Sequence, residues 1–249
     1  MKRLFVILSL LFFTVASNGA TETINWYVDG ETYATTTCES GGNINLPTTP
    51  TKYGYTFQGW FSYTQLEYLE STGTQWINTG IIPRKNIKVD IDLQLKSVVS
   101  GRYIFGSWNP YAQYYMYISN GKWQWGWSSD YQTTSINADY NRHNFVLYSD
   151  EVYSYIVLDN TVIQSAITKT QSIGPSFVIF AGRSDDNNIA SPLAQKIYSC
   201  KIYDNDTLVR DFIPVLDHSG VPCMYDKVEE KFYYNAGTGD FIAGPIINE

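Results

Sequence analysis

The stretch Leu66-Glu-Tyr-Leu-Glu-Ser-Thr-Gly-Thr-Gln-Trp-Ile-Asn-Thr-Gly80 marks the point where this chain changes character. Two prolines and two turn glycines precede it between residues 46 and 61, and short apolar runs separated by turn residues follow it. Short apolar runs bounded by Gly, Asn and Asp predict strands, and no segment carries a convincing helical period. We therefore predict an all-β protein whose large domain spans residues 65–249.

The clearest predicted strand is Ile87–Leu95. It alternates apolar and polar residues without exception, so its five apolar side chains should face the core. The dipeptide Asn120-Gly121 is the strongest short signal for a hairpin, and it should join Gln113–Ser119 to Lys122–Trp127. Many short strands of this kind predict a sandwich or jelly roll.

The first twenty residues have the layout of a secretory signal peptide. A basic start, Met1-Lys2-Arg3, is followed by the apolar run Leu4–Val15 and by small residues up to Ala20. A membrane anchor is the alternative, but the apolar run is shorter than the roughly 20 residues that a spanning helix needs. We predict that residues 1–20 are removed and that the mature chain has no transmembrane segment and is secreted or located at the cell surface.

The overall composition excludes some partners. The net charge is −7 and the pI is near 4.8, whereas nucleic acid and anionic lipid both attract basic proteins. Charged residues make up only 16% of the chain and aromatic residues another 16%, with 21 tyrosines. Aromatic side chains pack well on pleated sheets, which agrees with the all-β prediction.

The cysteine and histidine content is low. Three cysteines are too few for a disulfide framework, although an oxidising compartment would permit a Cys200–Cys223 bridge. The alternative is that both are buried thiols, and Cys38 is interpreted as a thiol. With two histidines and no Cys-x-x-Cys pair, no zinc site is indicated.

Residues 21–64 form the predicted first unit, with a hairpin of Ile24–Gly30 and Glu31–Thr37. The segment Leu46-Pro-Thr-Thr-Pro-Thr-Lys-Tyr-Gly-Tyr-Thr-Phe-Gln-Gly-Trp-Phe61 follows. This unit resembles the Listeria–Bacteroides repeat, also called the internalin B-type repeat, a small β-grasp-like module. The resemblance implies an extracellular spacer or presentation module. The usual final strand after the Gly-Trp-aromatic element is missing, which suggests that the unit leans on the second domain.

Residues 65–249 resemble the laminin-G/concanavalin A-like β-sandwich of bacterial surface and phage-tail proteins. The resemblance implies a jelly-roll sandwich, a fold on which functions diverge widely. The segments that carry it are residues 66–80, Tyr103–Gly106, Phe180–Arg183, Lys196–Tyr203, Val209–Val215, and Tyr225-Asp226 followed by Phe232–Phe241.

The richest aromatic stretch lies between residues 108 and 131. Trp123, Trp125 and Trp127 share one strand face by the two-residue period, and that face could be the core of the sandwich. Binding residues concentrate in loops, and sugar rings stack on flat aromatic side chains. The predicted ligand-binding residues, each near a predicted loop, are Trp108, Tyr111, Trp127 and Tyr131.

Other chemistry is less well supported. Asp185-Asp-Asn-Asn188 could offer oxygens to calcium, although such clusters are ordinary turn chemistry, so no cofactor is predicted beyond this weakly supported calcium. Glycoside hydrolysis needs two close carboxylates, and Asp90 and Asp92 occupy the polar face of an alternating strand with no glutamate beside them. Neither histidine lies in a nucleophile context, so we predict that the protein is not an enzyme.

These observations favour a non-catalytic extracellular recognition module that binds a glycan. The alternative is a structural or protein-adhesion module with no small-ligand site, whose partner is an extracellular protein. A hydrolase is a third and weaker alternative.

Overall fold

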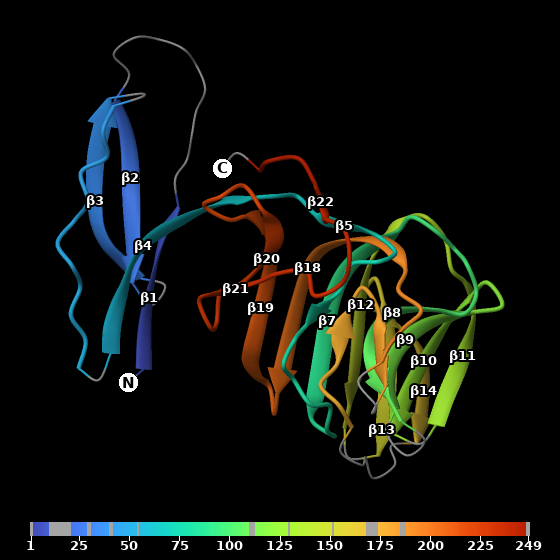
Figure 1. Cartoon of the computed structure of the whole chain (residues 1–249). Helices are drawn as coiled ribbons and strands as arrows, with labels where there is room; N and C mark the ends of the chain where they lie inside the picture. Colours follow the sequence, from blue (N-terminus) through green and yellow to red (C-terminus); the bar gives the residue numbers. More distant parts are fainter. Residues whose placement is uncertain are drawn as a thin grey trace.

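A computed structural model of the chain describes residues 2–9, 21–28, 31–39, 42–53, 55–109, 113–128, 130–150, 152–167, 174–184 and 188–247, and only the backbone of residues 2–9, 55, 56, 58, 59, 61, 62 and 167. Within these residues every regular element is a β-strand and no helix occurs, so the all-β prediction is confirmed. Figure 1 shows a large unit of two packed sheets and a smaller unit at the N-terminal end.

The first sheet of the large unit has a central ladder of six antiparallel strands. Its order is β14 (Thr161–Ile167), β13 (Tyr153–Leu158), β12 (Arg142–Ser149), β7 (Ile87–Leu95), β18 (Ala194–Asp204) and β19 (Thr207–Leu216). Shorter strands pair at its margins, namely β20 (Pro222–Asp226), β21 (Lys231–Tyr233), β5 (Leu69–Thr72) and β22 (Ile242–Ala243).

The second sheet packs against the first. Its order is β11 (Asp130–Asn137), β10 (Lys122–Ser128), β9 (Gln113–Ser119), β8 (Arg102–Trp108), β15 (Val178–Ile179) and β6 (Ile77–Asn78), with β16 (Gly182–Ser184) and β17 (Ile189–Ala190) beside β8. Asn120 and Gly121 join β9 to β10 with φ angles of 50° and 71°. Positive φ at both central residues is the geometry that an Asn-Gly hairpin requires, so this prediction is confirmed.

The core lies between the two sheets. All five apolar side chains of β7 are buried, as its alternation predicts, while its polar residues are only partly covered. Trp123 and Trp125 from β10 face them from the second sheet and are fully buried. The sequence left open whether Trp123 and Trp125 belong to the core or to a binding face, and the structure places both in the core. Together these side chains form one contiguous apolar layer, which is the main stabilising feature of a sandwich.

The stretch 66–80 crosses from one sheet to the other. It contributes β5 to the first sheet and β6 to the second, and a buried glutamine, Gln75, lies between them. The Gln75 Oε1 atom accepts hydrogen bonds from the Thr72 backbone N–H (2.8 Å) and the Ser71 hydroxyl (3.0 Å). Its Nε2 atom donates to the Asp240 carbonyl at 3.0 Å. One side chain thus connects the turn to the C-terminal part of the chain.

The N-terminal unit is a four-stranded sheet in the order β4 (Tyr55–Gln65), β1 (Lys2–Ser9), β2 (Thr21–Val28) and β3 (Glu31–Glu39). The hairpin of β2 and β3 agrees with the sequence prediction. Its small apolar cluster centres on Trp26, whose ring meets that of Trp60 at 4.8 Å, edge to face. The Trp26 indole N–H donates to the Thr36 hydroxyl at 2.8 Å.

Strand β4 continues into the large unit. Its last residues, Thr64 and Gln65, pair with Leu216 and Val215 of β19. The Tyr63 ring stacks on Tyr225 with a centroid distance of 4.8 Å. The smaller unit thus packs against the sandwich. The sequence suggested this contact because the final strand of the repeat is missing. The predicted domain boundary between residues 64 and 65 lies at the C-terminal end of β4, which runs from Tyr55 to Gln65 without a break.

The cysteines of the large unit are free thiols. Cys200 lies in the core between the two sheets, whereas Cys223 belongs to a separate apolar cluster with Val215 and Tyr225. Because the two side chains lie in different clusters, the structure supports the buried-thiol alternative over a Cys200–Cys223 bridge.

We expect Cys200 and Cys223 to react with a thiol reagent only after unfolding. Burial raises the pKa of both thiols, that of Cys223 to about 12, so neither forms the reactive thiolate near neutral pH. A chromogenic disulfide reagent should titrate all three cysteines in denaturant without reductant. A single reactive thiol under those conditions would instead indicate the bridge.

His143 at the start of β12 lies between two carboxylates. Its Nδ1 atom is 2.7 Å from Asp159 Oδ2, and its Nε2 atom is 3.1 Å from Asp139 Oδ1. Burial lowers the pKa of His143, but the hydrogen bonds to Asp159 and Asp139 outweigh it, so the pKa is raised overall. The pKa values of both carboxyls are lowered, because their bonds to His143 and to backbone N–H groups outweigh partial burial.

This cluster should stabilise the fold most between about pH 4 and pH 6.5. The histidine contribution is complete below its unfolded pKa and is lost as the pH rises through the raised folded pKa. The carboxyl contributions are present above the unfolded value and are lost as the pH falls through the lowered folded pKa. Thermal unfolding of wild type and His143→Gln should therefore differ more at about pH 5.5 than at about pH 8. An equal difference at both values would contradict the assignment.

Candidate functional site

The outward face of the second sheet presents aromatic and uncharged polar side chains in rows. Directly paired residues on neighbouring strands point to the same side, so the register defines each row. One row contains Tyr103, Tyr117, Gln124 and Thr133. The next contains Gly106, Tyr115, Gly126 and Tyr131, and a third contains Trp108, Gln113 and Ser128. None of these residues carries a charge.

Four tyrosines form the centre of this surface, and we call Tyr103, Tyr115, Tyr117 and Tyr131 the tyrosine face. The Tyr103 ring lies 4.7 Å from that of Tyr117 and 5.3 Å from that of Tyr115, edge to face in both cases. Tyr131 at the margin is 58% exposed, Tyr103 and Tyr117 are half-buried, and Tyr115 is buried. The face therefore offers ring edges and hydroxyls on a well-packed base.

Glycines allow these rings to lie close to the sheet. A Cβ atom on Gly126 would lie 2.6 Å from the Tyr115 ring, and one on Gly182 would lie 2.5 Å from the Tyr103 ring. Gly106, which pairs with Tyr115, has a φ of 139° and equally little room. The absence of these side chains lets the tyrosine rings cover the backbone.

The polar groups of this surface are connected to one another. Gln124 Nε2 donates to the Tyr115 hydroxyl at 3.1 Å, and the Thr133 hydroxyl donates to Gln124 Oε1 at 3.2 Å. Burial raises the pKa of Tyr115 to about 12, and burial together with Tyr115 and Tyr117 raises that of Tyr103. Both hydroxyls thus stay protonated near neutral pH and can donate as well as accept hydrogen bonds.

The outward face of the first sheet has a different character. Arg142 stacks on the Tyr198 ring at 3.6 Å and binds both carboxylate oxygens of Asp92, at 2.9 and 2.6 Å. Lys196 lies over the Tyr68 ring at 3.8 Å. Charged pairs cover the aromatic rings there. The two outer faces of the sandwich therefore differ in the polarity that they offer to a ligand.

The predicted ligand-binding residues fall in different places. Tyr131 belongs to the tyrosine face, and Trp108 lies half-buried in the third row. Trp127 is only 3% exposed and packs against Tyr114 in the core at 5.0 Å, because it points to the same side of β10 as Trp123 and Trp125. Tyr111 lies outside the described residues.

Tyr103, Tyr115 and Tyr117 were missed from the sequence. Tyr115 and Tyr117 alternate with the core residues Tyr114 and Met116, so their outward direction depends on the register of β9. Tyr115 pairs with Gly106 on one neighbouring strand and with Gly126 on the other, and such glycine–tyrosine pairs indicate an outward ring. The pairs become visible only when the strand register is known.

The candidate metal and catalytic groups add no second site. Asp185, Asp186 and Asn187 lie outside the described residues, and Asn188 is exposed. Among the described residues no group of three His, Cys, Asp or Glu side chains could hold a metal ion. Asp90 accepts a hydrogen bond from Asn144 at 2.7 Å, Asp92 is paired with Arg142, and both ring nitrogens of His143 contact carboxylates.

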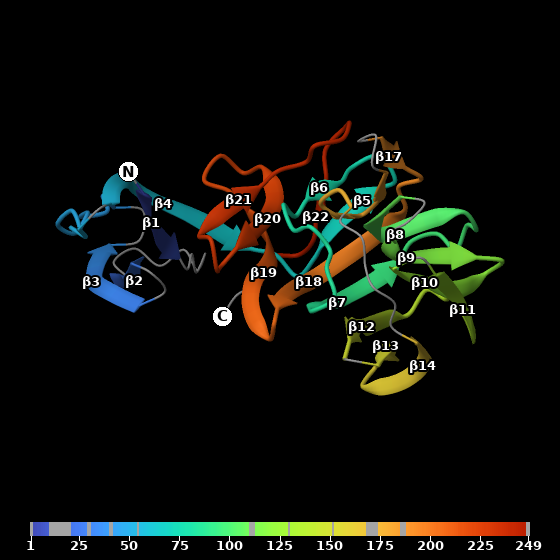
Figure 2. The same ribbon diagram turned by 90° about the horizontal axis from the view of Figure 1, so that it is seen from below.

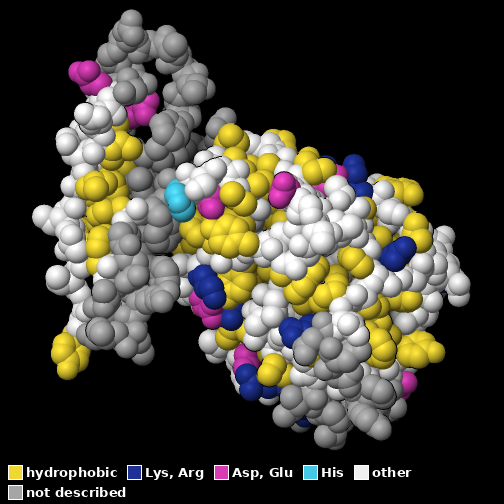
Figure 3. All heavy atoms as spheres, in the orientation of Figure 1, with side chains coloured by type: hydrophobic (Ala, Val, Ile, Leu, Met, Phe, Trp, Pro, Cys, Tyr) yellow, Lys and Arg dark blue, Asp and Glu magenta, His cyan; other side chains and the backbone are white. Residues whose placement is uncertain are grey.

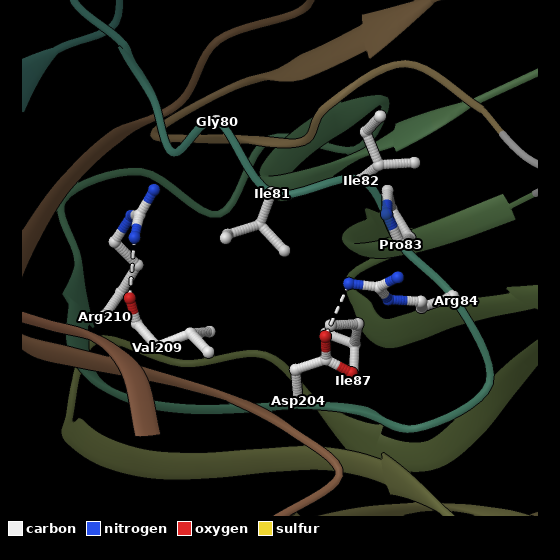
Figure 4. A pocket seen from close by; sticks show the side chains of 9 residues that line it. All are labelled: Gly80, Ile81, Ile82, Pro83, Arg84, Ile87, Asp204, Val209 and Arg210. Atoms are coloured by element: carbon white, nitrogen blue, oxygen red, sulfur yellow. Dashed lines mark hydrogen bonds and ion pairs between the residues drawn. The ribbon is translucent and has the colours of Figure 1, made fainter. Parts of the chain in front are cut away.

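A hollow of about 460 Å³ lies between residues 80–87 and the ends of β18 and β19 (Figure 4). Its walls are largely aliphatic, and Arg84 and Arg210 flank it on either side of Ile81. Arg84 is paired with Asp204 at 2.5 Å, while Arg210 donates to the Val209 carbonyl and contacts Glu229. Both cations are thus already engaged, so we regard the hollow as a weaker candidate than the tyrosine face.

Figure 3 shows the distribution of charge on one side of the molecule. On the side seen in Figure 3, charged side chains are sparse, and hydrophobic groups lie between them in scattered patches. No helix long and apolar enough to cross a membrane occurs in the described part of the chain.

Comparisons with known proteins agree with parts of this picture. Residues 23–89 match the Listeria-Bacteroides repeat domain family, which covers less than half of the chain. No curated protein sequence matches the chain.

A crystal structure from Bacteroides ovatus, described as that of a candidate carbohydrate-binding protein, aligns with 94% of this chain and 72% of its own, with a TM-score of 0.54 and 9% identity. A mutant of HCR/D aligns with 55% of this chain and 42% of its own, at 12% identity and a TM-score of 0.37. At this low identity the first similarity supports the sandwich fold alone, and the second is too weak to support the fold.

We expect Gly126→Ala to destabilise the protein by about 1–3 kcal/mol, because its new methyl group would overlap the Tyr115 ring. In urea denaturation, the cost of Gly126→Ala combined with Tyr115→Ala should be clearly smaller than the sum of the two single costs. Gly126→Ala combined with Tyr148→Ala is the matched control and should be additive, because Tyr148 stacks on Tyr155 in the first sheet. Additive costs for both pairs would mean that the Tyr115 ring does not rest on Gly126.

Proposed function

We propose that this protein is a non-catalytic, extracellular carbohydrate-binding module and that the tyrosine face holds the glycan. The observation that carries the proposal is a set of three rows on the outer sheet face that combine close-packed tyrosine rings with glutamine, threonine and serine and contain no charged residue. Sugar rings present apolar C–H faces and many hydroxyls. An aromatic side chain that is apolar in its body and polar at its tip suits both features.

The arrangement of the polar groups supports the same proposal. The protonated hydroxyl of Tyr103 and the hydrogen-bonded pair of Gln124 and Tyr115 lie in the same two rows as the half-buried Tyr117 and the exposed Tyr131. A few fixed polar groups within an apolar surface are what orients a small ligand. The lack of charge in the three rows favours a neutral glycan over a sulfated or uronic acid chain, because the cation that follows in the next row, Lys122, already donates to the Ser135 carbonyl at 3.2 Å.

Two comparisons with known proteins support the proposal. The Bacteroides ovatus protein with a similar fold is described as a candidate carbohydrate-binding protein, and the N-terminal repeat is related to a family of surface proteins. We propose that the large unit is a laminin-G/concanavalin A-like sandwich and that the chain is exported through residues 1–20. A structural or protein-adhesion role is the second candidate, favoured by the partial burial of the tyrosine rings.

A glycan array on the secreted protein, followed by calorimetry on the best ligand, tests the proposal. Tyr117→Ala and Tyr131→Ala should each weaken binding by about three- to tenfold, because each removes one aromatic contact. Tyr148→Ala is the matched control, since Tyr148 stacks on Tyr155 in the first sheet, and it should bind as wild type. A chelator should have no effect, because the tyrosine face has no carboxylate.

Two results would overturn the proposal. Folded protein that binds no glycan on the array would favour the protein-adhesion role. Binding that is lost with the chelator but unchanged in both tyrosine variants would move the site to the segment of residues 185–188.

A further inference from the structure

Strand β1 lies between β2 and β4, as the two views in Figures 1 and 2 agree. It runs antiparallel to β2, with pairs from Val6–Val28 to Ser9–Asn25, and parallel to β4, with pairs from Lys2–Tyr55 to Ser9–Tyr63. Within the described residues no backbone pairing joins β2 directly to β4. One strand therefore closes the small sheet.

The strand that closes the sheet belongs to the segment predicted to be a signal peptide. Removal of residues 1–20 would leave β2 and β4 facing each other as two open edges. Neighbouring strands lie about 4.8 Å apart, so β2 and β4 would lie about 9.6 Å from each other, with room for one strand between them. We call this gap the strand slot.

The strand slot has an apolar floor and uncharged edges. Trp26 of β2 and Trp60 of β4 meet across it at 4.8 Å, so the aromatic contact spans both sides. None of residues 24–28 or 55–65 is charged, and no proline occurs among them. Proteins usually protect open edges with charges, prolines or a covering segment, and the described edges lack the first two.

We propose that the mature protein uses the strand slot to bind an extended segment of a partner protein, which adds a strand between β2 and β4. Main-chain hydrogen bonds to both edges would give affinity, and alternate apolar side chains over Trp26 and Trp60 would give selectivity. The sequence of β1 indicates what fits: about eight residues with an apolar run and no proline. The proposal rests on removal of residues 1–20 and is independent of glycan binding.

A second copy of the chain is a poorer occupant than an unfolded partner segment. A strand that fills the slot must have both edges free, whereas every described strand of the large unit is already paired on at least one edge. Donation by a second copy would therefore require part of its sandwich to unfold.

The test uses the mature chain, residues 21–249, and a labelled peptide of residues 2–9 with added C-terminal lysines for solubility. Fluorescence anisotropy should show saturable binding to the protein, and amide hydrogen exchange at residues 25–28 and 55–63 should slow by at least about tenfold. The matched control is the same peptide with Val6→Pro, which removes a ladder donor and should bind much more weakly.

Three outcomes would overturn the proposal. Protected amides in the peptide-free monomer, without peptide binding, would mean that β2 and β4 close on each other. Protection that rises with protein concentration together with a dimer mass would make a second copy the occupant. An intact mass of the secreted protein that includes residues 1–20 would mean that β1 stays in place.

Discussion

The hydrogen bonds of Gln75 are the constraint on which the sandwich depends most directly. This buried amide contacts the Ser71–Thr72 end of β5, the turn after it and the Asp240 carbonyl near the C-terminus. A buried amide with both ends satisfied is stable, whereas one that loses a partner costs about 1–3 kcal/mol. The crossing between the sheets and the end of the chain are thus fixed by the same side chain. The Thr74 hydroxyl adds a bond to the Thr238 carbonyl at 2.8 Å.

With the two sheets joined in this way, strand register decides what each outer face presents. Tryptophans of β10 face inward, and the residues between them on β10 pair outward with tyrosines of β9 and β11. The same alternation on the first sheet places Asp92 and Lys196 outward, where Arg142 and Tyr68 meet them. On the outer face of the first sheet, charged side chains cover aromatic rings. On the outer face of the second sheet, tyrosine rings cover glycine residues.

The sequence was sufficient to predict the elements that alternation defines. Ile87–Leu95 and the Asn120-Gly121 hairpin could be assigned because period and turn chemistry are local properties. The binding face could not be assigned in the same way, because it is built from rows across four strands. Trp127 illustrates the difference, since its place near a predicted loop suggested exposure while its register on β10 placed it in the core. Strand β11 was missed because its polar sequence lacks an apolar run.

The continuity of β4 also determines how the protein would carry mechanical load. No flexible linker separates the two units, because β4 belongs to both. Its last two residues pair with β19, and Tyr63 just before them stacks on Tyr225. A pull on the small unit would reach the edge of the sandwich directly, at a junction only two residue pairs long. The junction therefore passes load from the small unit straight into the first sheet of the sandwich.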